Sequence, residues 1–390
     1  MGLRSILRLR PLRRALVKAR WVGGRCFMGL CHGALGVKPN RIYFSSFKGR
    51  GYTDSPARIC EALHALRPDL ELVWQMKRRE DAPGYVRVVK PRTPAALWAI
   101  STARCLVDNM NRQQYMVKFP DQLYVQTWHG DRGFKKMLFD MDDGQTFPDG
   151  KQIDLAVSGS DFGTKNYRTA FRYPGEVMQL GIPRNDALVA PDPKKIADVR
   201  RRLGLPEGVK VLLYVPTFRA ELAGHDQPAG FDIGRALDRL RESTGSEWLC
   251  LTRAHSQNLR VSGAQDQRVR DVTDWPETNE LLLCADMLIS DYSSTAGDYV
   301  LLDRPVLLYQ GDYDRFVGGE REMYFDLRSC PYVRAESEEE LYRLLGDIDA
   351  LIPSCAEVRR FYGVTETGHS TQAVAAWILE KLEQPAAKRG

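Results

Sequence analysis

A run of apolar residues near position 290 leads directly into small hydroxyl residues, in the order Leu-Ile-Ser-Asp-Tyr-Ser-Ser-Thr over 288–295. A buried strand that ends in hydroxyl side chains at the start of a helix offers N–H groups to an anion, and the helix dipole favours negative charge there. The pattern therefore predicts phosphate binding by Ser293, Ser294 and Thr295. The alternative is that Ser294 or Thr295 is only a helix N-cap.

Two acidic residues belong to the same segment. Asp291 opens it, and we count it with the candidate binding residues. Asp298 lies one helical turn after Ser294 and is expected to reach a sugar hydroxyl of the same ligand. The alternative for Asp298 is a surface acid.

Two histidines follow predicted strands and are candidates for acid–base chemistry. His129 stands between Trp128 and Gly130; a buried tryptophan would fix this backbone, and glycine would permit a sharp turn that exposes the imidazole. A histidine so placed is a candidate general base at neutral pH, although a lone histidine is more often structural. His255 follows Arg253 by two residues, and such a pair can place two cationic donors on one phosphate. The alternative is an exposed turn.

Further potential anion donors are scattered through the chain. Taken singly, each is more often an ordinary surface or loop residue. Together with the two histidines they would surround one site, and they are Lys135, Arg184, Asn185, Thr217 and Arg219.

The elements that must position these residues alternate between strands and helices from residue 41 onward. Predicted strands in the first half are Arg41–Phe47, Leu70–Met76, Tyr85–Val89, Ala103–Asp108, Leu123–Thr127, Asp154–Ser158 and Val177–Leu180. In the second half they are Val209–Val215, Trp248–Thr252, Val269–Val272, Met287–Ser290 and Pro305–Tyr309. This alternation predicts an α/β protein with two Rossmann-like domains, 38–186 and 187–390, the second carrying helices that close the chain. Ligands bind such sheets beyond the carboxyl ends of the strands, where the polar motifs lie.

Charge is unevenly distributed along the chain. Of 56 Lys and Arg, 12 fall within residues 1–53, where there is no acid, and the rest of the chain is mildly acidic. Residues 1–37 combine apolar residues with eight of these cations, so we predict a basic amphipathic arm that contacts an anionic membrane surface, with a helix beginning near residue 12 after a break at Pro11. The alternative is a solvated or packed leader helix. The local charge argues against a nucleic-acid partner.

Several other classes are disfavoured. No stretch approaches 18 uninterrupted apolar residues, and arginines interrupt any apolar core of a signal peptide. The eight cysteines form no CxxC pair, and the Asp140, Asp142 and Asp143 cluster lacks further ligands in register, so neither a metal nor a cofactor is expected. Glycine-rich nucleotide loops and a Gly-x-Ser-x-Gly elbow are also missing from the sequence.

Five ordered motifs resemble the CDP-glycerol glycerophosphotransferase family, the teichoic-acid primases and polymerases and related capsule polymerases. They are Gln126–Gly130, Gly181–Asp186, Leu213–Arg219, Arg253–His255 and Ile289–Ser294, and Tyr52–Pro56 is similar to an early family element. The resemblance spans about residues 41–330. It implies a GT-B fold with the acceptor domain first and the CDP-binding domain second.

The resemblance also implies a reaction, in which glycerol phosphate passes from CDP-glycerol to a hydroxyl of a lipid-linked acceptor at the cytoplasmic face of the membrane, and CMP is released. His129 would deprotonate the acceptor, His255 would contact the donor phosphates, and Ser293 and Ser294 would hold the pyrophosphate. Ribitol phosphate transfer, a nucleotide-sugar glycosyltransferase and a membrane-associated scaffold remain alternatives.

The sequence departs from the family pattern at two places. Asp131–Lys135 replaces the usual Thr-Pro-Leu-Lys and is one residue longer, and Ser256 stands where proline is common. The first departure follows the motif of the acceptor domain, so it is expected to affect acceptor identity more than the chemistry.

Overall fold

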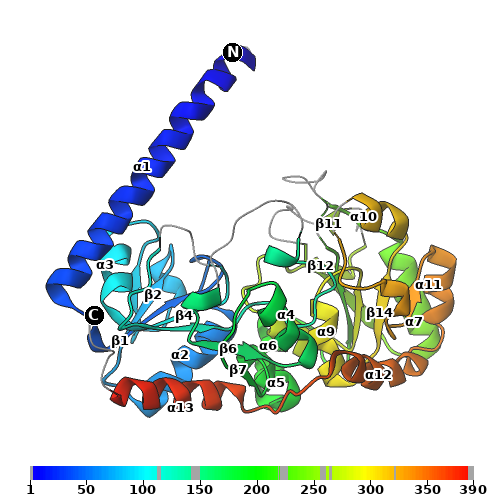
Figure 1. Ribbon diagram of the computed structural model, residues 1–390. Coiled ribbons are helices and arrows are strands. Elements are labelled where there is room, and N and C mark those ends of the chain that lie inside the picture. Colours follow the sequence, from blue (N-terminus) through cyan, green and yellow to red (C-terminus); the bar gives the residue numbers. More distant parts are fainter. Residues whose placement is uncertain are drawn as a thin grey trace.

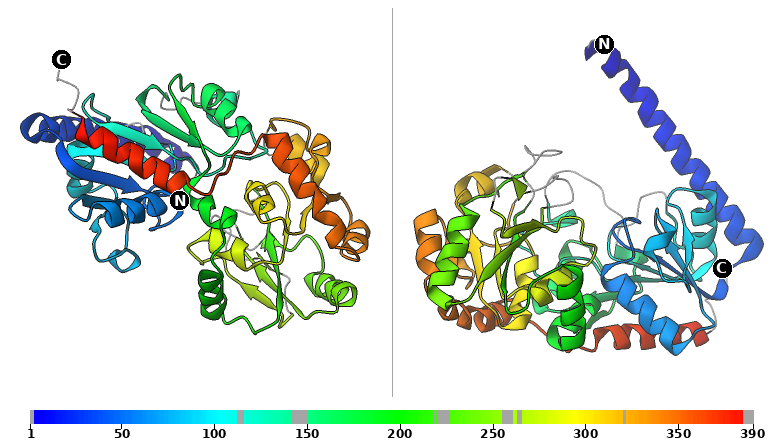
Figure 2. Two further views of the ribbon diagram at one scale, coloured as in Figure 1. Left: turned by 90° about the horizontal axis from the view of Figure 1, so that it is seen from below. Right: turned by 180° about the vertical axis from the view of Figure 1, so that it is seen from behind.

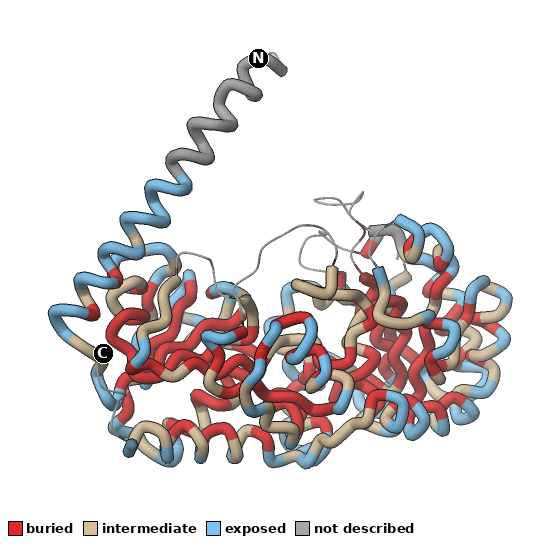
Figure 3. The backbone as a smooth tube through the Cα atoms, viewed as in Figure 1, coloured by how far each residue is buried: buried red, intermediate tan, exposed pale blue. Residues whose placement is uncertain are grey.

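The structure is a computed structural model that describes residues 3–111, 116–141, 150–217, 219, 227–254, 261–262, 266–319 and 322–384, with the side chains of the first helix described from Val17 onward. The chain forms two α/β halves that lie side by side (Figure 1). Buried residues concentrate along the strands of both halves (Figure 3).

The first half is built on a seven-stranded sheet whose pairings are all parallel. In spatial order the strands are β3 (Arg87–Val89), β2 (Glu71–Gln75), β1 (Lys38–Ser45), β4 (Ala103–Asp108), β5 (Leu123–Gln126), β6 (Leu155–Ser158) and β7 (Val177–Gln179). The order reverses between β1 and β4, as in a dinucleotide-binding fold. Two hydrophobic clusters cover its two faces.

The second half repeats this plan with a six-stranded parallel sheet. The strands, in spatial order, are β12 (Val269–Asp271), β10 (Trp248–Thr252), β8 (Lys210–Val215), β13 (Met287–Ser290), β14 (Val306–Tyr309) and β15 (Arg334–Ala335). Five of the six residues of β8 are buried, as expected for a continuous apolar run in a central parallel strand. A separate pair joins β9 (Gln227–Pro228) to β11 (Val261–Ser262).

Most helices follow strands and cover the sheets. In chain order they are α2 (Asp54–Leu66), α3 (Pro94–Thr102), α4 (Asp161–Thr169), α5 (Asp186–Val189), α6 (Pro193–Arg202), α7 (Ile233–Thr244), α8 (Thr278–Cys284), α9 (Thr295–Tyr299), α10 (Tyr313–Gly319), α11 (Glu338–Leu344) and α12 (Pro353–Tyr362). Local sequence sets their ends: Asp232 caps α7 by accepting from the Arg235 N–H, and Gly245 ends it at φ 66°. The predicted pair of Rossmann-like halves in a GT-B-like arrangement is confirmed.

The last helix, α13 (Ser370–Glu383), returns to the first half. Its residues Val374, Ala375 and Ile378 are fully buried in the cluster that contains Ile42 and Leu155. Figures 1 and 2 show this red helix lying along the first half. The predicted domain 187–390 therefore differs from the packing, because its final helix completes the core of domain 38–186. An apolar stripe in a terminal helix does not reveal which of two sheets will bury it.

The first helix, α1 (Leu3–Leu35), projects from the first half (Figure 1). Its C-terminal part packs on α3: Met28 is fully buried, and Nδ1 of His32 lies 3.0 Å from the carbonyl oxygen of Ser101. The predicted break at Pro11 was wrong, since the helix runs from Leu3 to Leu35 through that position. Among the helices that the structure describes, none combines the length and apolarity needed to cross a bilayer.

Candidate active site

The loops that carry the predicted site residues follow strands of both sheets. In the first half they follow β5 and β7, and in the second half β8, β10 and β13. Strand order reverses between β1 and β4 and between β8 and β13, the points where open parallel sheets bind ligands. Gly130 of the first half approaches Ser294 of the second, so these two sets of loops meet.

The imidazole of His129 is half-buried and oriented by the loop after β4. Its Nδ1 lies 2.7 Å from the carbonyl oxygen of Asn109. Because a carbonyl oxygen only accepts, Nδ1 carries the proton in the neutral ring, and Nε2 keeps its lone pair. The rings of Trp128 and Phe47 pack on it at centroid distances of 4.2 and 5.6 Å. One nitrogen is thus left able to accept a proton.

The pKa of His129 is lowered from the usual value for histidine. Burial is the largest cause, because removal from water penalises the imidazolium form. The hydrogen bond to Asn109 and the charge of Asp54 act in the opposite direction, and the charges of Arg184 and Lys48 add to the lowering. The ring is therefore neutral at neutral pH, which is the form that a general base requires.

The loop before this histidine is strained. Trp128 has φ 50°, in the left-handed region that bulky residues rarely adopt. Its N–H donates to Gln126 Oε1 at 2.8 Å, and its ring meets Phe171 edge-on at 4.9 Å. The sharp turn predicted at Gly130 thus falls at Trp128. The backbone at Gly130 approaches the second half closely, since a Cβ there would lie 3.3 Å from Ser294 Oγ.

The residues after β13 form a compact turn at the start of α9. The hydroxyl of Ser293 donates to Thr295 Oγ1 at 2.9 Å, and the Thr295 N–H donates to Ser293 Oγ at 3.3 Å. Ser294 makes no capping hydrogen bond with its side chain, and all three residues are partly exposed. Hydroxyl groups gathered in this way favour an anion. Phosphate binding at the turn 293–295 stays a prediction.

Asp291 joins the loop after β8 to the end of β13. Its carboxylate accepts from the Thr217 N–H at 2.9 and 3.0 Å and from Arg219 Nη2 at 3.1 Å. Arg219 also pairs with both carboxylate oxygens of Asp312, at 2.9 and 3.2 Å. The predicted binding residues Thr217 and Arg219 are thereby fixed beside the turn 293–295, with the guanidinium shared between two carboxylates.

Two other predicted cations are also engaged within the protein. Nζ of Lys135 lies 4.8 Å from the ring centroid of Phe316. Arg253 donates from Nη1 to the carbonyl oxygen of Trp275 at 2.5 Å, and burial lowers the pKa of its guanidinium. His255 lies outside the described residues, so its predicted role at the donor phosphates stays a prediction.

Three more predicted residues form one buried cluster. Arg184 donates from Nη2 to Asp298 at 2.9 Å, and Asn185 donates from Nδ2 to the same carboxylate at 3.0 Å. Burial raises the pKa of Asp298, but the charges of Arg184 and Arg132 outweigh it and hold the pKa below its usual value. Contact of these three side chains with substrate stays a prediction, and in the structure their polar atoms bind one another.

Sequence reasoning missed three residues of this region. Asn109 directly follows β4, so the strand-end rule that selected His129 would also have found it. Asp54, within the early element similar to the family, has φ 64° and accepts from Arg184 Nη1 at 3.4 Å. Its N–H donates to Glu277 Oε1 at 3.2 Å, a contact between the two halves that nothing in the sequence signals.

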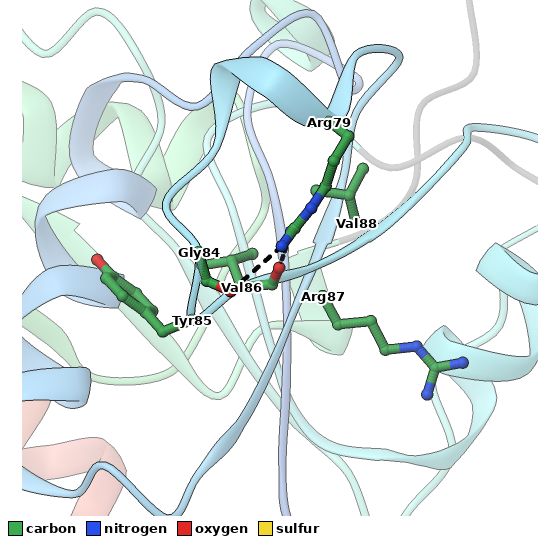
Figure 4. A pocket seen from close by; sticks show the side chains of 6 residues that line it. All are labelled: Arg79, Gly84, Tyr85, Val86, Arg87 and Val88. Carbon is green, nitrogen blue, oxygen red and sulfur yellow. Dashed lines mark hydrogen bonds between the residues drawn. The ribbon is translucent and has the colours of Figure 1, made fainter.

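An open hollow of about 450 Å³ lies along β3 (Figure 4), lined by Arg79, Gly84, Tyr85, Val86, Arg87 and Val88. Arg79 folds back onto the carbonyl oxygens of Gly84 and Val86, so its donors are used within the loop. None of the predicted site residues lines the hollow. Within the described part of the chain, no group of His, Cys, Asp or Glu side chains is arranged to hold a metal ion.

Two Rossmann-like halves, with a histidine loop of one meeting a hydroxyl-rich turn of the other, define a GT-B-type fold with a site between its halves. The chain belongs to the family described as CDP-Glycerol:Poly(glycerophosphate) glycerophosphotransferase, which matches residues 27–375. The resemblance carried by the five motifs is confirmed.

Individual relatives agree with this membership. A teichoic acid poly(glycerol phosphate) polymerase of Staphylococcus epidermidis is 33% identical over 74% of this chain and 43% of its own length. A teichoic acid glycerol-phosphate transferase of Staphylococcus aureus is 28% identical over 87% of this chain and 93% of its own. A solved structure of the wall teichoic acid polymerase TagF, soaked with CDPG, is 27% identical, with a TM-score of 0.82, over 98% of this chain and 99% of that one. The chain thus spans less than half of the Staphylococcus epidermidis polymerase.

Proposed function

We propose that this chain transfers glycerol phosphate from CDP-glycerol to a hydroxyl group of a membrane-linked acceptor of the teichoic-acid or capsule type, releasing CMP. The observation that carries the proposal is the approach of Gly130 to Ser294, because it brings the loop of His129 against the turn 293–295. Membership of the family and the names of the relatives support CDP-glycerol as the donor.

In this reaction Nε2 of His129 accepts the proton of the acceptor hydroxyl. The acceptor oxygen attacks the phosphorus that bears glycerol, and the bond from that phosphorus to the bridging oxygen breaks. CMP leaves with the electron pair, and a phosphodiester links glycerol phosphate to the acceptor. The proton stays on the imidazole until it is released to solvent. Nδ1 keeps its hydrogen bond to Asn109 throughout, which holds the ring in place.

Charge on the diphosphate must be neutralised as the bond to CMP breaks. The hydroxyl group of Ser294 lies against the histidine loop, and Ser293 and Thr295 belong to the same turn; preorganised donors of this kind stabilise developing negative charge. We assign His255, Arg253, Arg219, Thr217 and Lys135 to the wider donor site as predicted, with Arg219 acting at longer range because two carboxylates already hold it. Trp128 and Gly130 shape the acceptor side.

The N-terminal helix supplies the proposed membrane contact at the cytoplasmic face. Eight Lys or Arg lie between residues 4 and 25, and α1 projects away from both sheets (Figure 1). Its described part exposes Trp21, Val22 and Leu30. Each cation near an anionic leaflet contributes about 1 kcal/mol.

Co-sedimentation with vesicles tests this contact. Binding to phosphatidylglycerol but not phosphatidylcholine vesicles is expected, and it should be lost when Arg13, Arg14, Lys18 and Arg20 are replaced by serine. A matched control replaces four exposed arginines of the second half, namely Arg201, Arg241, Arg315 and Arg343. Equal binding by both variants would contradict the assignment of the arm.

Donor choice tests the proposed reaction itself. The purified chain is incubated with a lipid-linked acceptor and either CDP-glycerol, CDP-ribitol, a UDP-sugar or a GDP-sugar, and nucleotide release and product length are followed. We expect nucleotide release to be fastest with CDP-glycerol, which yields CMP. Preference for CDP-ribitol would reassign the polyol, since ribitol-phosphate enzymes are also among the relatives. If only a nucleotide sugar were turned over, or if no donor were turned over, the proposal would be overturned.

A further inference from the structure

The segment that follows His129 crosses from the first half into the second. Phe134 is 1% exposed and packs in the core cluster of the second sheet, with Leu213 and Leu288. The Lys136 N–H donates to the carbonyl oxygen of Glu322 at 2.9 Å, and a second backbone hydrogen bond joins 324 to 134. The histidine loop is therefore continuous with a segment that is built into the other half.

Two adjacent residues, Asp131 and Arg132, anchor this crossing. Asp131 accepts from the hydroxyls of Ser158 and Ser160, at 2.9 and 2.6 Å, and from the Gly159 N–H at 3.2 Å. These contacts fix it to the turn between β6 and α4. The side chain of the next residue, Arg132, reaches both halves: Nη1 lies 3.4 Å from Asp131 Oδ2 and 3.4 Å from the Gly159 carbonyl oxygen, and the other nitrogens bond the second half.

Arg132 is fully buried and binds α9, the helix that begins at the turn 293–295. Its Nε donates to the carbonyl oxygen of Gly297 at 2.8 Å, and Nη2 donates to Asp298 at 2.7 Å. Nη1 donates to Glu366 at 2.9 Å, in the segment that leads back to the first half. Arg132 packs directly against the backbone of Gly297, because a Cβ built there would lie 2.7 Å from Arg132 Cβ.

We propose that Arg132 is a positioning residue that sets the separation between the imidazole of His129 and the turn 293–295. The inference rests on the proposed function, in which these two groups act on acceptor and donor. The loop of His129 and the turn 293–295 lie close together: Cβ atoms built at Gly130 and Gly133 would lie 3.7 and 3.8 Å from Ser294 Cβ. This is the separation that Arg132 sets.

The contacts of Asp131 and Arg132 also bear on the segment 131–135, where the sequence departs from the family pattern. These two residues open the segment, which the sequence predicts to affect acceptor identity. Both side chains are buried and bind protein groups, at 6% and 0% exposure. The departure therefore acts on the geometry between the halves.

Arg132→Lys tests the proposal, with Arg41→Lys as a matched control. Arg41 is also fully buried, and it pairs with Glu71 at 2.9 and 3.0 Å near the amino-terminal ends of β1 and β2, whereas His129 follows the carboxyl end of β5. Lysine keeps the charge but loses the planar fork that holds several acceptors at once. We expect Arg132→Lys to lower kcat at least tenfold with the Kd for CDP-glycerol changed less than twofold, since small displacements at a reacting centre cost about 100-fold. Arg41→Lys should leave both constants within twofold.

If both variants only lower the melting temperature and keep kcat, Arg132 is structural and the proposal is overturned. Should Arg132→Lys fail to fold, Arg132→Gln combined with Glu366→Gln replaces it, because this pair removes one positive and one negative charge together. For this double variant we again expect kcat to fall at least tenfold with the Kd for CDP-glycerol changed less than twofold. A retained kcat would overturn the proposal.

A second measurement does not depend on turnover. Cysteines introduced as Gly133→Cys and Ser294→Cys would have Cβ atoms near 3.8 Å apart, the usual separation in a disulfide. We expect this pair to oxidise at least tenfold faster in the parent background than with Arg132→Lys, while Arg41→Lys has no effect. Equal rates in all backgrounds would overturn the positioning role. Absence of CDP-glycerol turnover in the parent protein, with this rate difference intact, would instead overturn the proposed function.

Discussion

Gly130 and Ser294 come from opposite halves of the chain, yet a Cβ built on Gly130 would lie 3.3 Å from the Ser294 hydroxyl oxygen. This contact joins a loop of the first sheet to a turn of the second. It explains why the residue after the candidate base is glycine, and it makes the side chain at this position a sensitive probe of the site.

Gly130→Ala should displace the Ser294 hydroxyl, because the added methyl is too close for the present rotamer while a serine side chain can rotate away. We expect the Kd for CDP-glycerol to rise about five- to tenfold, equivalent to the net value of one hydrogen bond of about 1 kcal/mol, with the fold intact. Calorimetry measures the Kd. Gly84→Ala is the control, since a Cβ at Gly84 meets nothing within 4 Å; equal effects of the two substitutions would contradict the contact.

The pH dependence of turnover reports on His129. Since burial lowers the pKa of its imidazole, the ring stays neutral below the ordinary histidine value of about 6.5. Activity of a general base is lost only when it is protonated, so the acid limb of kcat/KM should have its midpoint below pH 6.5. A limb centred at or above pH 6.5 would be inconsistent with this environment.

Ser294→Ala removes a hydroxyl that the turn itself does not use for capping. A hydrogen bond to a charged group contributes about 1.5–3 kcal/mol, so the Kd for CDP-glycerol should rise roughly ten- to hundredfold while the melting temperature is kept. His255→Ala is expected to weaken binding in the same assay. The control is Ser329→Ala, at an exposed serine of the second half. Unchanged affinity in both Ser294→Ala and His255→Ala would rule out the phosphate site.

Glu277 links stability to pH. Burial raises the pKa of its carboxyl to about 7, although Arg58 acts in the opposite direction. The folded state therefore binds more protons than the unfolded state between about pH 4.3 and 7, so stability falls as pH rises through this window and the loss is complete above it. Glu277→Gln keeps an acceptor for the Asp54 N–H and should stabilise the protein at pH 8 by about 2 kcal/mol. Urea unfolding at pH 5 and pH 8 checks this, and a destabilised variant at pH 8 would contradict it.

Much of the fold was predictable because its strands are apolar runs of the right length. The central strands β8 and β13 and the polar turn after β13 lie where the sequence placed them. The local sequence indicates these elements, since a short apolar run followed by hydroxyl residues is typical of a buried strand that ends in a polar turn.

Long-range pairing was not predictable. Nothing local indicates that α13 covers the first sheet, or that Arg132 pairs with Asp298, 166 residues away. The partners of Arg184 and Asn185 were also hidden, because a buried arginine and an anion-binding arginine look alike in sequence. Pro11 shows the opposite error, in which a local rule was given too much weight.

The most direct test of the central claim compares the parent protein with His129→Ala, using CDP-glycerol and a lipid-linked acceptor. We predict that CMP release falls by about 100-fold or more, the usual contribution of a general base, while the Kd for CDP-glycerol stays within twofold. Retained turnover in His129→Ala, or loss of CDP-glycerol binding, would contradict the assignment of His129 as the base.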